Sequence, residues 1–306
     1  MKILIVGGTG LIGAEAALYL QAQGHDVSLM ARKSTEVAAL KGFPFIQCDY
    51  INDDVNDGRL IGFDILIFSA AADIRHIPQD GSITPTEFYT QANDAAVPRF
   101  FQAAKGAGIH QAIYIGTFYP QIAPEKIGVC PYVTSRHNTC ETIMQMHATD
   151  FKVIALNAPF VLGYIEGMEI PHLDGLVAYA KGYIPELPLF APKGGTNHIS
   201  SKSIAQACGN IIAKGLGGKA YLLGDENYLW TDYLTQWFEL AGNPVKFSVS
   251  DDEHPMFPNI IMFAGVGATV HYEPYEETMN DLEYDRGQIQ VTIEALIAIF
   301  DAKKIS

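Results

Sequence analysis

Basic residues are scarce in this sequence, and long apolar runs are missing. The 306 residues include 20 Lys and Arg against 34 Asp and Glu, which gives a formal net charge of −14. An acidic surface repels nucleic acid and anionic membranes, so we expect neither as a partner. The sequence lacks a run of about 18 uninterrupted apolar residues, so we expect no transmembrane helix.

Cysteine is also rare. Cys48, Cys130, Cys140 and Cys208 show no C-x-x-C spacing and no accompanying His cluster, so we expect no metal site. Unpaired thiols are typical of a reducing compartment. Because the first predicted strand begins at the second residue, no signal peptide fits before it. The expected location is therefore the cytoplasm.

The first half of the chain alternates short apolar runs with helical stretches, on a background of 48% hydrophobic and 18% charged residues. This alternation predicts an α/β fold, a doubly wound parallel (Rossmann) sheet buried on both faces. The expected strands are Ile3–Val6, Val27–Met30, Phe45–Cys48, Ile65–Phe68, Ala112–Gly116 and Val153–Asn157. The expected helices are Leu11–Gln23, Thr35–Lys41, Glu87–Ala107 and Tyr132–Ala148.

The second half reads differently, because loops rich in Gly and Pro interrupt it. We expect a dinucleotide-binding domain over residues 1–157 and a smaller substrate-binding cap over 158–306, with some cap segments returning to the core sheet. Helices are expected at Ser201–Lys214, Thr231–Leu240 and Val291–Asp301. The apolar segment Met256–Phe263 suggests an apolar ligand, although cap core or a dimer contact would equally explain it.

A glycine-rich turn follows the first strand and opens the first helix. It reads Gly7-Gly8-Thr9-Gly10-Leu11-Ile12-Gly13. Glycines let the backbone turn tightly and approach a pyrophosphate, and the helix N-terminus offers it unpaired N–H groups. We therefore expect a nucleotide site here; a tight structural turn with an empty helix start is the alternative.

Residues after the next strands predict how the nucleotide is selected. Arg32 and Lys33 end the second strand, where an acidic residue would select NAD, and two cations suit the 2′-phosphate of NADP(H). They could instead be solvated surface charges. Asp49, after the third strand, could accept from the adenine amino group or be a turn residue. The small Ala70 and Ala71 end the fourth strand and would let a cofactor lie against the backbone.

Tyr132 and Arg136 lie four residues apart at the start of a predicted helix, so both side chains share one face. A cation beside a phenol lowers the phenol pKa toward the range useful for proton transfer. Thr117, at the end of the fifth strand, could bond a substrate oxygen next to Tyr132, and Tyr119 is a spare candidate acid. The alternative is an ordinary helix with a packed aromatic residue and an exposed Arg.

These residues occur in the order of a known family. The chain resembles the extended short-chain dehydrogenase/reductases, the NAD-dependent epimerase/dehydratase group, and its dihydroflavonol-reductase-like branch. The matching pieces are "GGTGLIG", "CDYIND", "DILIFSAAA", "QANDAAVPRFFQAAKGAGIHQAIYIGT", "PYVTSR" and "LNAPFVLG". The resemblance implies that the three spaced glycines hold the pyrophosphate and that Tyr132 is the general acid/base, with Thr117 as the catalytic Ser/Thr. It also implies that Asn93 supports the active-site backbone and that Pro159 and Val161 lie near the nicotinamide.

Two departures from the family pattern matter for function. The family expects Tyr-x-x-x-Lys, whereas Arg136 occupies the Lys position, and Arg is longer and planar. Sugar-nucleotide members usually carry an Arg in the second half where this chain reads Thr196-Asn197-His198-Ile199, which argues against a nucleotide-sugar substrate.

The sequence therefore predicts an NADPH-dependent reductase of a hydrophobic ketone or aldehyde, with Tyr132 as the general acid. Two alternatives remain open: an NADP(H)-binding redox sensor or regulator, and a non-redox isomerase, epimerase or lyase on the same scaffold. A homodimer is possible, because dimers through the fourth and fifth helices are common in the resembled family.

Overall fold

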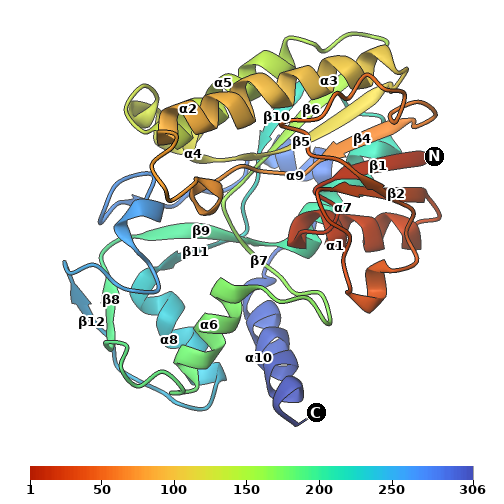
Figure 1. The fold of residues 1–306 in the computed structure, drawn as a ribbon. Helices are drawn as coiled ribbons and strands as arrows, with labels where there is room; N and C mark the ends of the chain where they lie inside the picture. Colours follow the sequence, from red (N-terminus) through yellow and green to blue (C-terminus); the bar gives the residue numbers. More distant parts are fainter. Residues whose placement is uncertain (306) are drawn as a thin grey trace.

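A computed structural model describes residues 1–305 of the chain (Figure 1). Its main sheet has seven parallel strands: β1 (Lys2–Val6), β2 (Asp26–Ala31), β3 (Phe45–Gln47), β4 (Ile65–Phe68), β5 (Gln111–Thr117), β6 (Lys152–Ala158) and β10 (Lys219–Leu222). Their spatial order is β10-β6-β5-β4-β1-β2-β3. The predicted doubly wound parallel sheet is confirmed, and β10 comes from the second half of the chain.

Helices cover both faces of this sheet. Helices α2 (Pro85–Tyr89), α3 (Ala96–Gly106) and α5 (Pro131–Met144) lie on the upper face in Figure 1, and α1 (Leu11–Ala22) and α7 (Ser201–Lys214) lie on the lower face. Every residue of β4 and β5 is buried, as expected for strands covered on both sides. Two apolar clusters, one on each face, form the core of this part.

The strand order reverses beside β1. The chain runs outward from β1 through β2 to β3, and then crosses to β4 on the other side of β1. The carboxyl ends of β1 and β4 lie at this reversal, which is where doubly wound sheets bind ligands.

The second half builds a smaller cap below the main sheet (Figure 1). Its larger sheet contains β7 (Phe160–Leu162), β9 (Gly195–Ser200), β11 (Glu226–Leu229) and β13 (Thr269–Val270), and its smaller sheet pairs β8 (Phe190–Pro192) with β12 (Ser248–Ser250). Helices α6 (Pro171–Ala180), α8 (Trp230–Leu240) and α10 (Ile289–Ile305) pack around a third apolar cluster.

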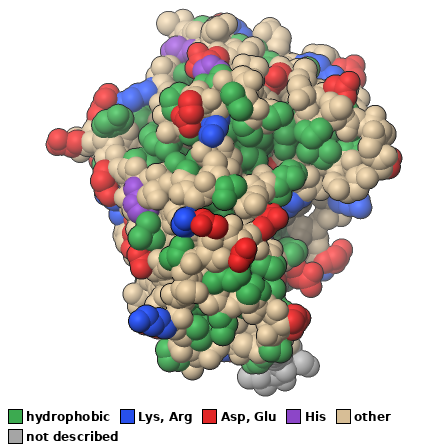
Figure 2. Space-filling model, turned by 90° about the vertical axis from the view of Figure 1, so that its left-hand side faces the viewer, with side chains coloured by type: hydrophobic (Ala, Val, Ile, Leu, Met, Phe, Trp, Pro, Cys, Tyr) green, Lys and Arg blue, Asp and Glu red, His purple; other side chains and the backbone are tan. Residues whose placement is uncertain are grey.

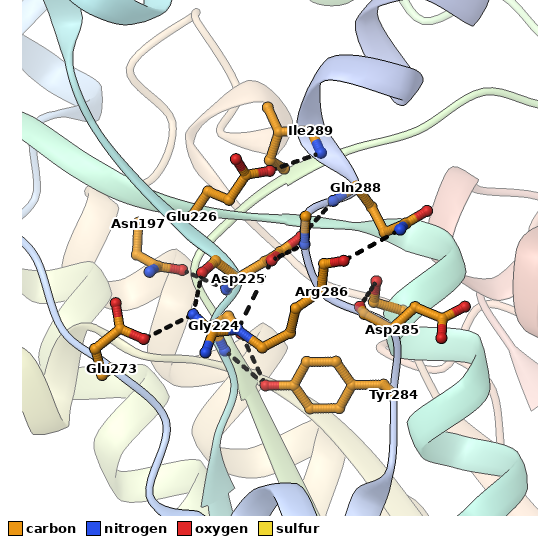
Figure 3. Close-up of polar contacts among 12 residues, drawn as sticks. Asn197, Gly224, Asp225, Glu226, Glu273, Tyr284, Asp285, Arg286, Gln288 and Ile289 are labelled. Carbon is orange, nitrogen blue, oxygen red and sulfur yellow. Dashed lines mark hydrogen bonds and ion pairs between the residues drawn. The ribbon is translucent and has the colours of Figure 1, made fainter.

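A polar joint connects the main sheet to the cap (Figure 3). Asp225, just after β10, is buried, and its carboxylate accepts hydrogen bonds from the backbone N–H groups of Gly287 (2.6 Å) and Gln288 (3.0 Å). Glu226 accepts from Ile289 N at 3.0 Å. Two carboxylates therefore satisfy free N–H groups at the start of α10, where the helix dipole favours negative charge.

Several predicted elements differ from the structure. The helix expected over 35–41 is a single 3₁₀ turn, Ala38–Leu40, because Gly42 and Pro44 follow closely and stop it. The long helix expected over 87–107 begins at Pro85 and is interrupted by a π-helical turn, Thr90–Ala95. Pro98 explains the interruption, since its ring clashes with the carbonyl four residues earlier in a regular α-helix.

The sequence also missed elements in the second half. Helix α6, the short helix α9 (Glu276–Leu282) and the cap strands are absent from the expected elements. The cap strands have two to six residues, which is too few to show a period of their own.

Candidate active site

The glycine turn joins β1 to α1 at this reversal of the strand order. Gly7 has φ of +81°, and a Cβ there would lie 2.6 Å from the backbone nitrogen of Ala70. A Cβ at Gly13 would lie 2.4 Å from the carbonyl oxygen of Gly7. Only glycine fits at these two positions, because the turn, the end of β4 and the helix start pack directly on one another.

Gly10 differs from its neighbours. A Cβ at Gly10 would meet only the Gly7 oxygen, at 3.5 Å, and the residue is exposed. Gly10 is also the N-cap of α1, and no side chain caps that helix. An open backbone surface at an uncapped helix N-terminus fits the pyrophosphate of a dinucleotide. Thr9, Leu11 and Ile12 flank it and are half-buried.

The residues predicted to select the nucleotide lie around the same edge of the sheet. Arg32 and Lys33 follow β2, are exposed and form no ion pair within residues 1–305. Ala70 is half-buried and Ala71 exposed directly after β4. The Asp49 carboxylate accepts from Ile51 N (3.0 Å) and Asn52 Nδ2 (2.9 Å), so it stabilises its own turn.

Thr117 and Tyr132 meet at the carboxyl end of β5. Thr117 is the last residue of the strand, and Pro131, a favourable first-turn residue, starts the helix that presents Tyr132. Interaction of the Thr117 hydroxyl with the Tyr132 phenol lowers the pKa of that phenol. A phenol and a hydroxyl together can hold one substrate oxygen and exchange a proton with it.

The electrostatics of Tyr132 differ from the expectation. Burial is the largest influence and raises the pKa of Tyr132, while the charge of Arg136 lowers it by less. The net pKa therefore lies above the usual value, and the expected depression is wrong for the protein without ligands. The physical reason is that desolvation of the phenolate outweighs one nearby cation.

Arg136 is almost fully buried. Its guanidinium lies 5.1 Å from the centroid of the Tyr114 ring and 6.0 Å from that of Tyr132. Nη2 donates to the Ile115 carbonyl at 2.9 Å, whereas Nε and Nη1 have no hydrogen-bond partner within the described chain. The expected alternative of an exposed Arg is wrong, and two free donors remain for a bound ligand.

Asn93 lies inside the π-helical turn and is fully buried. Its Nδ2 donates to the Ala72 carbonyl at 3.4 Å, and its Oδ1 has no partner among residues 1–305. Contact with the loop after β4 agrees with a role in supporting the site backbone. π-Helical turns are frequent at functional sites. Pro159 is buried between β6 and β7, and Val161 is half-buried in β7.

Sequence reasoning missed several residues that surround Tyr132. Phe263 stacks on its ring at 4.2 Å between centroids, and Tyr89 contacts its edge at 5.6 Å. Asp73 and Arg75, on the loop after β4, act on the pKa of Tyr132 with opposite signs. Two features of the sequence could have indicated these residues: the apolar segment that ends at Phe263, and the length of the loop that begins at Asp73.

Across residues 1–305 no group of three or more His, Cys, Asp or Glu side chains could hold a metal ion. None of the helices in that range is long and apolar enough to cross a membrane.

The comparisons with known proteins agree with this architecture. Residues 3–157 match the model of the NAD dependent epimerase/dehydratase family, so the chain belongs to this family of NAD-dependent enzymes. Among curated protein sequences, none matches the chain. The dihydroflavonol-reductase-like branch stays a prediction.

Solved structures share the fold over the full length. The UDP-glucose-4-epimerase of Stenotrophomonas maltophila, with bound NAD and formylated UDP-arabinopyranose, is 15% identical, with 100% of this chain and 99% of that chain covered and a TM-score of 0.77. The UDP-glucose 4-epimerase of Bifidobacterium longum, in complex with NAD+ and UDP, is 17% identical, with coverage of 100% and 99% and a TM-score of 0.73. The protein gox2253 is 17% identical, with 98% of both chains covered and a TM-score of 0.78. Identities this low show the fold alone.

Proposed function

We propose that this chain is a nicotinamide-dependent enzyme that inverts the configuration of a hydroxyl-bearing carbon, or moves the hydroxyl to another carbon, without net oxidation or reduction. The observation that carries this proposal is the pairing of Tyr132 with Thr117 at the edge of the sheet that also holds the glycine turn. Membership of an epimerase/dehydratase family, and neighbours named as epimerases, support this alternative better than the reductase expected from the sequence.

The residues of the site have defined tasks in this proposal. The phenolate form of Tyr132 accepts the substrate hydroxyl proton as the carbon is oxidised to a carbonyl, and the resulting phenol returns the proton when the hydroxyl forms again. Thr117 hydrogen-bonds the same oxygen, and the charge of Arg136 favours the phenolate. A bound dinucleotide supplies the acceptor and donor of the hydride, so one cofactor serves many turnovers.

For the cofactor we propose NADP(H) rather than NAD(H). The support is the pair Arg32 and Lys33, which is exposed after β2 and free of ion pairs within the described residues. The two UDP-glucose epimerase structures contain NAD, so binding titrations with both nucleotides decide between the two cofactors.

A second candidate is an NADPH-dependent reductase of a hydrophobic ketone or aldehyde. The raised pKa of Tyr132 favours it, because a neutral phenol is a ready proton donor to a carbonyl oxygen. Both candidates use a small hydrophobic substrate. The four residues Thr196-Asn197-His198-Ile199 in β9 include no cation for a diphosphate.

The test uses a panel of diastereomerically pure secondary alcohols labelled with deuterium at the carbinol carbon. The protein is loaded with a substoichiometric amount of NADP⁺, or NAD⁺ in parallel, and products are separated chromatographically. The proposal expects a new diastereomer that retains the deuterium, with no lasting change in absorbance at 340 nm. Stoichiometric consumption of NADPH with the matching ketones would select the reductase, and an undiminished rate in Tyr132→Phe would refute both.

A further inference from the structure

One segment of the cap closes directly over the reacting phenol. The Phe263 ring lies parallel to that of Tyr132, at 4.2 Å between centroids and 24° between planes. Phe263 also contacts Tyr119 edge to face at 5.3 Å, and Tyr89 packs against Tyr132 from its own helix. The half-buried phenol ring is thus contacted by two aromatic rings from separate parts of the chain, and a third ring, Tyr119, packs on Phe263.

Phe263 belongs to a segment, residues 258–268, that we call the strap. It is the blue segment on the left side of Figure 1, the side that Figure 2 presents. Figure 2 shows hydrophobic side chains spread over the middle of this face, and Ile260 (61% exposed) and Val266 (62% exposed) belong to the strap. Phe263, by contrast, is half-buried against the main domain.

The strap is anchored at its N-terminal end in the cap core. Phe257, next to the strap, is 2% exposed, and its ring lies 4.8 Å from that of Trp230. At the start of the strap, Asn259 N donates to the Glu253 carboxylate at 2.8 Å. Phe257 and its neighbour Met256 pack with the cap cluster, so cap core explains this part of the apolar segment.

The C-terminal end of the strap is also anchored to the cap. Strand β13 (Thr269–Val270) pairs with β9, and Asn227 bonds both the backbone of Tyr272 (3.1 Å) and the Glu273 carboxylate (3.1 Å). Glu273 in turn forms an ion pair with Arg286 at 2.7 Å, which ties this end to the polar joint (Figure 3).

Within the strap, consecutive backbone hydrogen bonds fix the conformation. Met262 N donates to Asn259 O, Phe263 N to Ile261 O, and Gly265 N to Met262 O, at distances of 2.8–3.0 Å. A short segment with both ends bonded and internal turns loses little further entropy by staying closed.

We propose that the strap is a fixed wall of the substrate site, and that Phe263 is a specificity-determining residue against which a planar, apolar part of the substrate lies. This inference rests on the proposed function for the identity of Tyr132 as the reacting group. A ring on the substrate would contact Phe263 and Tyr119 as these rings contact each other, in stacked or edge-to-face geometry. A hydroxyl-rich group would lose its water there without gaining a partner from these rings.

The wall is tested by nitration of tyrosines with tetranitromethane, resolved by residue with peptide mass spectrometry. Tyr275, which is 74% exposed, is the internal reference. We expect Tyr132 in the native protein to react far more slowly than Tyr275, because modification follows exposure. In Phe263→Ala, Tyr132 should react about fivefold or more faster than it does in the native protein. Ile260→Ala, on the same strap, leaves the rate unchanged. Equal rates for Tyr132 and Tyr275 in the native protein would mean a strap that is mostly open, and would overturn the proposal.

One further variant, Phe263→Leu, separates the loss of the aromatic cover from a loss of folding. Phe263→Leu keeps part of the apolar cover and is expected to give an intermediate rate at an unchanged thermal midpoint. If Phe263→Ala does not fold, Phe263→Leu is the deciding variant. A Tyr132 nitration rate in Phe263→Leu equal to that of the native protein would contradict the proposal that Phe263 covers Tyr132.

The substrate class is tested by protection with two probes on the dinucleotide-loaded protein, 1-phenylethanol and glucose at equal concentration. The proposal expects 1-phenylethanol to slow the nitration of Tyr132 in the native protein and not in Phe263→Ala, and glucose to have no effect. Protection by glucose, or by neither probe, contradicts the planar apolar class. The nitration contrast between native protein and Phe263→Ala needs no cofactor, so it stands even if the proposed reaction fails.

Discussion

Arg136 lies beneath Tyr132 as a buried cation, with 6.0 Å between its guanidinium carbon and the centroid of the phenol ring. It forms no ion pair with a carboxylate anywhere in residues 1–305. Its nearest charge-stabilising neighbours are the Tyr114 and Tyr132 rings and the Ile115 carbonyl. A buried charge without an ion-pair partner is costly, and the two ring faces and the carbonyl offset part of that cost. The same charge lowers the pKa of Tyr132 and so stabilises its phenolate form.

This relationship predicts a pH effect. The charge of Arg136 lowers the pKa of Tyr132, so Arg136→Met should raise it. The limb of the pH–rate profile that reports the titration of Tyr132 would then move to higher pH, while Arg136→Lys, which keeps the charge, stays near the native profile. A limb that moves to lower pH in Arg136→Met would show that Arg136 does not act on Tyr132 in this way.

Two glycines of the turn should respond differently to alanine. In Gly13→Ala the new Cβ meets the Gly7 oxygen at 2.4 Å, and we expect the free energy of unfolding to fall by about 1–3 kcal/mol. In Gly10→Ala the contact is an ordinary 3.5 Å, so stability should stay within about 0.5 kcal/mol. Dinucleotide affinity should nevertheless fall about tenfold, because the methyl group lies on the open phosphate face.

Chemical denaturation and a binding titration check both halves of this prediction. Gly106→Ala is the matched control, because a Cβ there meets nothing within 4 Å. A Gly10→Ala protein that binds dinucleotide as well as the native protein would place the pyrophosphate elsewhere.

Arg32 and Lys33 should decide between the two cofactors. The double variant Arg32→Ala/Lys33→Ala removes two cations that could pair with the 2′-phosphate, so the affinity for NADPH should fall about tenfold or more. The affinity for NADH should change little, because NADH lacks that phosphate. Equal losses for both nucleotides, measured by nicotinamide fluorescence, would contradict the role assigned to this pair.

Asp225 should make stability depend on pH. Burial raises its pKa above the usual 3.8, although two backbone N–H groups oppose the rise. The folded state therefore favours the protonated acid, and its contribution to stability is lost as the pH rises through the folded pKa.

Asp225→Asn keeps the shape but cannot ionise. The free energy of unfolding of this variant, relative to the native protein, should therefore increase as the pH rises from about 4 to 7. Urea denaturation at several pH values measures it, and Asp150→Asn, at an exposed position, is the control. A relative stability of Asp225→Asn that falls over this range would mean that Asp225 is ionised without cost in the folded protein.

The sequence predicted the parts of the molecule whose signals are local. The apolar runs of β1 and β4 and the glycines after β1 specify a strand, a turn and a helix start within a dozen residues. Tyr132 and Arg136 were correctly predicted to be neighbours, because residues four apart in a helix lie on the same face.

What the sequence could not predict depends on contacts between distant segments. Phe263 follows Tyr132 by more than a hundred residues, in a segment with no period, and only the folded cap brings the two rings together. The raised pKa of Tyr132 has the same origin, since burial by several segments outweighs the one local cation. The π-helical turn around Asn93 was also missed, because it depends on the later Pro98 and on packing.

The measurement that tests this account most directly is a titration of the purified protein with NADPH and, separately, NADH, followed by nicotinamide fluorescence. The account predicts saturable binding of both, tighter for NADPH, and weaker binding of each in Gly10→Ala. Tighter binding of NADH would overturn the cofactor choice and leave the site in place. Binding of neither nucleotide would contradict the central claim that the glycine turn and Tyr132 form one nicotinamide-dependent site.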